Sequence, residues 1–361
     1  MKHIHTSILA AATTVALPAV ANASAASHTY ANALSGHNIA ILQHTITQTA
    51  FQSFEGASET KLFSAPTQKE PQAPNADPNL YGKMPMYGEY NDDGNAGRNG
   101  GDIINQDAMI NSIWFNWQHV NDNIHIDNSS DADANFNTFM MGLAGGTAKM
   151  GNGISEWGIY TGYVDTKQTN FALETKGQGG YFGVYNGFDM GNFSLSSTIN
   201  GGVIDNSSDT IFGTDEFTNF WVGAAVNAAY NIALDRTFTL QPSLHMGYTW
   251  IKSENYTSVS GDILQNDAFN MFELTPEIRA IKHIGNGWYG TMGVKYVMIF
   301  ENGGDLSVNN IGAHELEIGD FFEYSISVER SVYNLHLSAS IGRHDGDHDG
   351  WTGGINIKYI F

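Results

Sequence analysis

The sequence contains no cysteine, so disulfide bonds contribute nothing to its stability. Basic residues are few: 16 Lys and Arg stand against 37 Asp and Glu, which gives a net charge of −21. Nucleic-acid binding requires clustered positive charge, so this balance argues against a nucleic acid as partner. Phosphate-binding loops, zinc-finger spacings and G-x-S-x-G elbows are missing as well. The sequence therefore predicts no cofactor.

Long apolar runs are also missing beyond the amino-terminal segment, although a membrane helix needs about 20 such residues. The run at Ile8–Val20 follows Lys2 and is too short to span a bilayer. Small residues in an A-x-A pattern follow it and end at Ala23 or Ala25. This order predicts a cleaved signal peptide over residues 1–25, in preference to a buried helix, and hence an exported protein.

Residues 26–108 differ in character from the rest of the chain. Apolar residues recur there at helical spacing: Ile39, Leu42, Ile46, Ala50 and Phe54. They predict a short amphipathic helix over residues 37–54, which we interpret as a surface or membrane-facing segment without chemistry. The Pro-rich and Gly/Asn-rich stretches that follow cannot bury a core, so the remainder of this region is expected to be a linker.

From Met109 to Phe361 the pattern changes to period two, which is typical of β-strands. Over residues 237–251, for example, Leu244 and Met246 alternate with His245 and Gly247. The polar face is rich in Ser, Gly, Asn and Thr, which suits the lumen of a membrane barrel, and the apolar face suits lipid. Residues 109–361 therefore predict an all-β fold, an antiparallel transmembrane β-barrel of about 12 strands.

Connection lengths support the barrel. Short turns are expected at one end, and long polar loops are expected at the other: Asn121–Ala134, Thr166–Lys176, Asp205–Glu216, Lys252–Asp267 and Glu301–His314. Outer-membrane barrels have short periplasmic turns and longer extracellular loops. An even number of strands also returns both ends of the barrel to the periplasm.

The carboxy-terminal half resembles the autotransporter β-domain, the translocator of type V secretion. The resemblance is carried by these segments: Leu240–Leu244 with Tyr248, Leu274–Arg279, Val294–Tyr296 with Phe300 and Glu301, Phe322–Tyr324 with Ser327, and Gly350–Phe361. It implies a monomeric barrel in the outer membrane of a Gram-negative bacterium, surrounded by lipid. It also implies recognition of the last strand by the barrel assembly machinery, through Ile357, Tyr359 and Phe361.

The sequence departs from that family in two ways. Members carry a large passenger ahead of the barrel, whereas only residues 26–108 are available here. Members also thread a helix through the pore directly before the first strand, where this chain offers only Asp102–Met109. We expect the segment Asn99–Met109 to fill the lumen; the alternative is a linker that hangs free in the periplasm.

Two clusters of polar residues are candidate sites. Asp345, Asp347 and His348 are weak metal candidates in one hairpin loop, but Asp and Gly are ordinary turn residues, so a solvated turn is preferred. Glu273, Glu277 and Arg279 share the lumenal face of one strand and predict a polar network inside the barrel, because buried charges need partners. The segment 99–109 is expected to lie against this network.

The function predicted from the sequence is an outer-membrane, autotransporter-type barrel that anchors or translocates its short amino-terminal region. One alternative is a pore or an adhesin that acts through acidic outer loops. Another is a hydrolase at the lumenal edge, for which the candidate residues are Glu323, Glu329, His245 and His336. Because accidental clusters are common among 13 histidines and 37 carboxylates, we expect no enzymatic activity.

Overall fold

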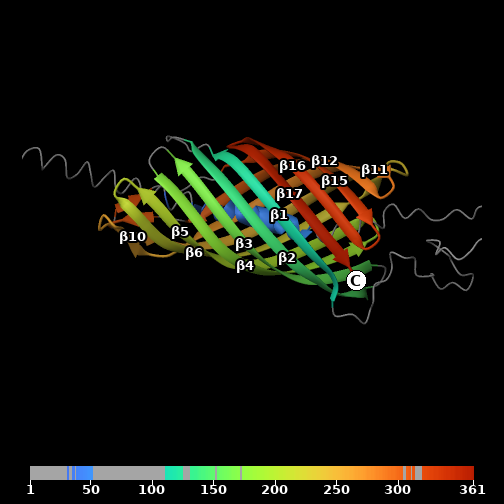
Figure 1. The fold of residues 1–361 in the computed structure, drawn as a ribbon, viewed down its shortest axis with the longest axis horizontal. Helices are drawn as coiled ribbons and strands as arrows, with labels where there is room; N and C mark the ends of the chain where they lie inside the picture. Colours follow the sequence, from blue (N-terminus) through green and yellow to red (C-terminus); the bar gives the residue numbers. More distant parts are fainter. Residues whose placement is uncertain are drawn as a thin grey trace, which may run out of the picture.

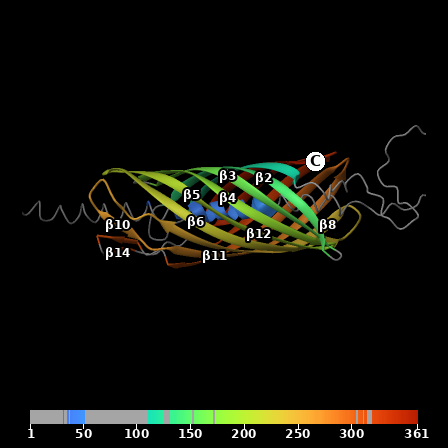
Figure 2. The same cartoon turned by 90° about the horizontal axis from the view of Figure 1, so that it is seen from below.

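The computed structural model describes residues 31, 35–36, 38–51, 110–124, 131–150, 153–170, 173–303, 306–309, 311–313 and 319–361. Twelve long strands form a closed barrel around one short helix (Figure 1; Figure 2). The long strands are β1 (Ile110–Ile124), β2 (Ala132–Met150), β3 (Gly153–Asn170), β4 (Leu173–Met190), β5 (Phe193–Thr210), β6 (Gly213–Tyr230), β8 (Phe238–Ser253), β11 (Phe269–Gly285), β12 (Trp288–Gly303), β15 (Phe321–Val332), β16 (Leu335–Gly346) and β17 (His348–Ile360). The predicted antiparallel barrel of about twelve strands is confirmed.

The barrel closes through the pairing of its first and last strands. β1 and β17 are antiparallel, with Ser112 opposite Ile360 at one end and Ile124 opposite His348 at the other. Each long strand therefore has two hydrogen-bonded neighbours. Such closure satisfies the backbone polar groups, which is what allows a sheet to cross lipid. Among the residues that the structure describes, no helix is long and apolar enough to span a membrane.

The two faces of the sheet have the predicted character. Leu244 is 40% exposed on the outer surface, whereas the next residue, His245, is 2% exposed inside the barrel. The same alternation recurs on the other strands, so the exterior carries a broad apolar band: Phe115, Phe139, Ile159, Phe182, Ile199, Val222, Met246, Ile278, Val294, Ile326 and Ile355 are examples. This band is the surface that meets lipid.

We call the end of the barrel where β1 begins and β17 finishes the turn end, and the opposite end the loop end. At the turn end, the amide of Phe361 donates to the carbonyl of Asn111 at 2.8 Å. Connections there are tight: Asn286 and Gly287 join β11 to β12 with φ angles of 53° and 74°. Two successive positive φ angles are the signature of a type I′ hairpin turn, which matches the twist of the strands.

At the loop end, two connections build a second, four-stranded sheet. Its strands are β9 (Tyr256–Thr257), β10 (Ile263–Asn266), β13 (Leu306–Val308) and β14 (Ile311–Ala313), in the order β14-β13-β10-β9. A further short strand, β7 (Ile232–Ala233), pairs with β8 at the turn end. The long connections expected over Lys252–Asp267 and Glu301–His314 are thus partly folded.

Two of the predicted long loops are wrong. Most of Thr166–Lys176 belongs to β3 and β4, and most of Asp205–Glu216 belongs to β5 and β6. These strands are polar on both faces at the loop end, which made them resemble loops in the sequence. Polar cross-strand pairs hold them together: Lys167 Nζ lies 2.9 Å from Glu174 Oε2, and Thr218 donates to Asp205 at 2.8 Å. The predicted signal peptide and linker lie outside the described residues.

Candidate functional site

A helix over residues 38–51 occupies the lumen (Figure 1). Its apolar stripe, formed by Ile39, Leu42, Ile46 and Ala50, is at most 1% exposed. The helix was predicted correctly from this spacing, but its expected place on a surface or against the membrane is wrong. The apolar stripe is covered instead by the inner wall of the barrel, and so it lies in the main hydrophobic core.

Large aromatic side chains fill the lumen on the side of β1 to β6. The aromatic wall consists of Trp114, Tyr160, Tyr181, Tyr185 and Trp221, all at most 4% exposed. Trp114 donates to the hydroxyl of Tyr185 at 3.3 Å, and the hydroxyls of Tyr160 and Tyr181 bond to threonines of nearby strands. Glycines leave room for the rings: a Cβ on Gly183 would lie 2.2 Å from the ring of Tyr160. The helix stripe packs against this wall as against an ordinary protein core.

On the opposite side of the helix, His44 joins it to the wall by polar contacts. His44 Nδ1 lies 2.7 Å from Glu273 Oε1 on β11, and His44 Nε2 lies 3.1 Å from Lys295 Nζ on β12. Because the lysine ammonium can only donate, Nε2 accepts and Nδ1 carries the proton that is donated to Glu273. Thr275 donates a second hydrogen bond to the same carboxylate, at 2.7 Å.

These contacts continue as a row of hydrogen-bonded ionisable side chains across the wall. Lys295 Nζ lies 3.0 Å from Glu323 Oε2, which is 3.2 Å from His344 Nε2. His344 Nδ1 is in turn 2.8 Å from Asp122 Oδ1 on β1. We call Glu273, His44, Lys295, Glu323, His344 and Asp122 the charge row; each is at most 9% exposed. Buried charges are tolerated when they are paired in this way, so the row fixes the helix against one side of the barrel.

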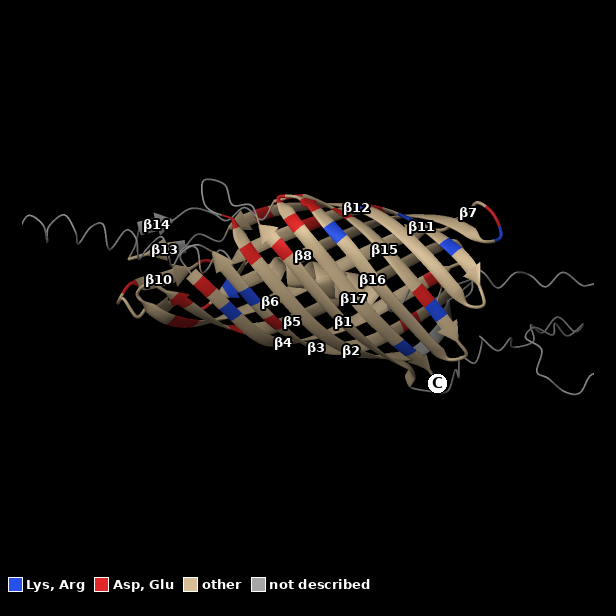
Figure 3. Cartoon of the chain, turned by 45° about the horizontal axis from the view of Figure 1, so that its top comes forward, with Lys and Arg blue, Asp and Glu red and all other residues tan. Residues whose placement is uncertain are grey.

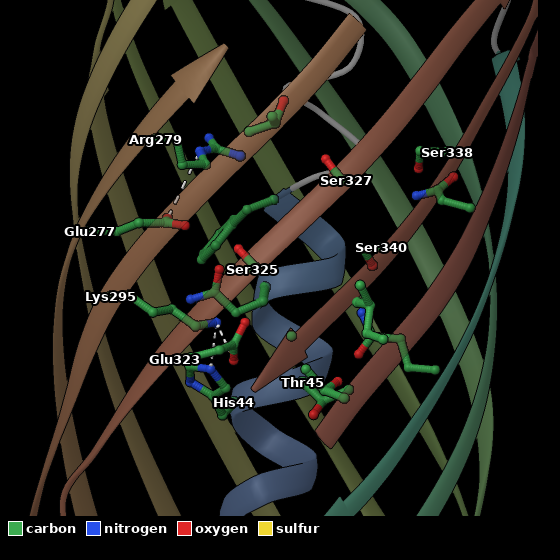
Figure 4. Close-up of a pocket in the computed structure, with 18 of the residues that line it drawn as sticks. His44, Thr45, Glu277, Arg279, Lys295, Glu323, Ser325, Ser327, Ser338 and Ser340 are labelled. Atoms are coloured by element: carbon green, nitrogen blue, oxygen red, sulfur yellow. Dashed lines mark hydrogen bonds and ion pairs between the residues drawn. The ribbon is translucent and has the colours of Figure 1, made fainter. Parts of the chain in front are cut away.

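Between the helix and β15 to β17 lies a hydrophilic cavity. Figure 4 shows Ser325, Ser327, Ser338 and Ser340 on its wall, across from Thr45 of the helix. Small hydroxyl side chains leave space that large aromatics fill on the other side. The lumen therefore has one packed half and one hollow half.

The predicted lumenal network is divided between two places. Glu277 and Arg279 both line the cavity, with Glu277 Oε2 3.9 Å from Arg279 Nε and accepting a hydrogen bond from Ser243 at 3.2 Å. Glu273 instead belongs to the charge row, where its partner is His44. The segment 99–109, which we expected to fill the lumen, lies outside the described residues.

The weak metal candidates do not converge. Asp345 and Asp347 are exposed, whereas His348 is buried and lies 3.4 Å from Asp122. The carboxylate of Asp347 accepts the amide of Asp320 at 2.9 Å, a bond that links this turn to the segment before β15. Among the residues that the structure describes, no group of three or more side chains could hold a metal ion.

The last strand presents its apolar row outward. Ile357, Tyr359 and Phe361 are 40%, 45% and 54% exposed, and the rings of the last two lie 5.6 Å apart. This row adjoins the seam between β17 and β1, where Tyr359 pairs with Ile113.

Sequence reasoning missed the most connected residues of the lumen, His44 and Lys295. One signal was available for each of them. Lys295 follows the exposed Val294 on β12, so the alternation of the strand points its side chain into the lumen. His44 lies outside the apolar stripe of the helix. The signal for their pairing was absent, since 251 positions separate them.

Comparisons with known proteins agree with this architecture. Residues 114–346 match the family described as the autotransporter beta-domain. No curated protein matches the chain. Three solved translocator structures are similar, at 14%, 14% and 12% identity. They are the beta domain of Bordetella BrkA (TM-score 0.58, covering 70% of this chain and 100% of that one), the transport unit of Escherichia coli AIDA-I (0.59, 69% and 90%) and the translocator domain of Neisseria meningitidis NalP (0.57, 71% and 91%). At these identities the likeness shows the fold.

Proposed function

The chain belongs to the autotransporter β-domain family, and we propose that its outer-membrane barrel anchors residues 38–51 in the lumen and presents the preceding part of the chain beyond the loop end. The observation that supports this most directly is the double attachment of the helix. An apolar stripe fixes it to the aromatic wall, and His44 ties its other side to the charge row.

The direction of the helix supports display of what precedes it. Ala31 packs with Ala132 and Leu173, the residues at which β2 and β4 begin at the loop end. At the other end of the helix, the ring of Phe51 lies 5.5 Å from that of His245, eight residues into β8 from the loop end. The chain thus runs down the lumen from the loop end, which faces outward in outer-membrane barrels.

Epitope tags test this direction. A tag inserted before Ala31 should bind antibody on intact cells, because the chain enters the lumen from outside. A tag inserted after Thr60 should bind only after the outer membrane is permeabilised. The reverse pattern, or equal labelling of both tags on intact cells, would overturn the proposal.

We further propose that the outward row of β17 is recognised during insertion by the barrel assembly machinery, as the family resemblance implies. Before the seam with β1 forms, this strand exposes an apolar row that ends at Phe361. Deleting Phe361 should lower the yield of heat-modifiable barrel in the outer membrane by several-fold. Deleting Leu234, an exposed residue in the turn-end connection before β8, is the control and should have less effect. Normal yield without Phe361 would count against this role.

We propose as well that the barrel is not an enzyme. The candidate hydrolytic residues serve separate contacts: His245 lies beside Glu273, Glu323 pairs with Lys295, and His336 Nδ1 lies 2.9 Å from the hydroxyl of Ser331. Turnover of lipid or peptide substrates by the purified, folded barrel, lost on replacing His245 or His336, would refute this.

A further inference from the structure

Three cations are exposed at the turn end of the barrel: Arg236, Lys282 and Arg330. Figure 3 shows blue segments at this end near the β7 and β11 labels. On β11 the outward row is apolar from Phe272 to Ala280 and then reaches Lys282. On β15 it is apolar from Phe322 to Val328 and then reaches Arg330. In both strands a cation thus lies one step before the turn-end limit of the outward row, where Ile284 or Val332 follows, near the level of lipid head groups.

The three cations are confined to one arc of the barrel. Arg236 lies two residues before β8, and β8, β11, β12 and β15 are consecutive neighbours in the sheet. The other Lys and Arg side chains that the structure describes lie in the lumen or at the loop end: Lys167, Lys176, Lys252, Arg279, Lys295, Arg343 and Lys358. The cluster is therefore a local patch, which we call the basic patch.

Aromatic rings beneath two of these cations hold them in place. The guanidinium of Arg330 lies 4.8 Å from the ring centre of its cross-strand partner Trp288. The ammonium of Lys282 lies 5.7 Å from the ring centre of Phe238, also its cross-strand partner, and donates to the Thr237 hydroxyl at 2.8 Å. Stacking of this kind orders long side chains without neutralising their charge.

No described carboxylate pairs directly with these cations, although Lys282, after the hydrogen bonds from Thr237, is among the groups that lower the pKa of Asp235. Among the described residues, Lys282, Arg330 and Arg236 form no ion pair. The nearby Asp235 is held by its own turn, where it accepts the amide and the hydroxyl of Thr237 at 2.6 and 2.9 Å. At the loop end, by contrast, Lys167 and Lys176 both pair with Glu174.

We propose that the basic patch binds the phosphate-bearing head group of an anionic phospholipid in the periplasmic leaflet of the outer membrane. The cations supply the opposite charge at head-group depth, and the aromatic and apolar rows above them contact the acyl chains. The proposal goes beyond the display function and is independent of it, since the patch lies outside the lumen. A free phosphate has the same charge but would gain nothing from the adjoining apolar surface.

Native mass spectrometry of the full barrel in mixed micelles tests the proposal, with phosphatidylglycerol competing against phosphatidylcholine. A cation near an anionic surface contributes on the order of a fivefold gain in binding, so Lys282→Gln with Arg330→Gln should lower phosphatidylglycerol retention about 25-fold. The matched pair at the loop end, Lys167→Gln with Lys176→Gln, should leave retention unchanged. Heat modifiability identifies folded protein, and Lys282→Gln alone replaces the double variant if the latter fails to fold.

Equal retention by the patch variant and the wild-type protein would overturn the proposal, as would an equal loss in the loop-end pair. Soluble glycerol phosphate and inorganic phosphate are then added as competitors of the bound lipid. Neither should displace the lipid at millimolar concentration. Displacement by either would assign the patch to free phosphate and would also overturn the proposal.

Discussion

Replacing Lys295 by Met should lower the free energy of unfolding by about 3–5 kcal/mol, the range expected when one partner of a buried ion pair is removed. Lys295 is 8% exposed and contacts both Glu323 and His44. Without its ammonium, Glu323 keeps only His344 as a cationic partner, and the acceptor nitrogen of His44 loses its donor. Denaturant unfolding in micelles, followed by Trp fluorescence, measures the change.

The double variant Lys295→Met with Glu323→Gln is the informative comparison. It removes the unpaired carboxylate together with the lysine, so it should be more stable than Lys295→Met alone. A single variant that loses less than about 1 kcal/mol, the value of a solvated surface pair, would show that water reaches the charge row and that the row does not anchor the helix.

Replacing Leu244 by Lys should destabilise the barrel by about 2–4 kcal/mol, the cost of a lysine at the bilayer midplane. Leu244 is the central residue of the outward row of β8, which runs from Phe238 to Trp250. Leu337→Lys should cost less, because Leu337 lies only two residues inside the turn-end limit of β16. Urea unfolding in lipid vesicles provides the measurement.

Ser243→Lys is the matched control for Leu244→Lys. Ser243 precedes Leu244, faces the lumen and already donates to Glu277, so an ammonium there gains a carboxylate neighbour. His245, on the other side of Leu244, is a poor control because it is packed between Glu273 and Phe51. Equal losses for Leu244→Lys and Ser243→Lys would contradict the assignment of one face to lipid and the other to the lumen.

The barrel was predictable because the alternation of apolar and polar residues along each strand is a local feature of the sequence. A two-residue period, as around Leu244 and His245, fixes both the strand and the side to which each residue points. The loops over Thr166–Lys176 and Asp205–Glu216 were mispredicted for the complementary reason. Where both faces of a hairpin carry polar residues, alternation gives no signal even though one face is buried, and only cross-strand pairs such as Lys167 with Glu174 indicate the strands.

The site was less predictable because its parts are distant in the sequence. The spacing of Ile39, Leu42 and Ile46 predicts a helix with an apolar stripe, but it does not say which surface covers that stripe. The covering surface is formed by glycines and aromatic residues of β1 to β6. These residues come together only through the register of several strands. The charge row likewise joins residues of five strands and the helix, so no local sequence pattern predicts it.

The unequal filling of the lumen has an evolutionary consequence. In the aromatic half, any side chain at Gly183 would collide with Tyr160, and a Cβ at Gly142 would lie 2.2 Å from Trp114. Such positions can change only together with their partners. Ser325 and Ser338, which face open space, can change alone. Under drift, the two halves of the lumen should diverge at different rates, and changes in the lumenal helix should be accommodated first by substitutions along β15 to β17.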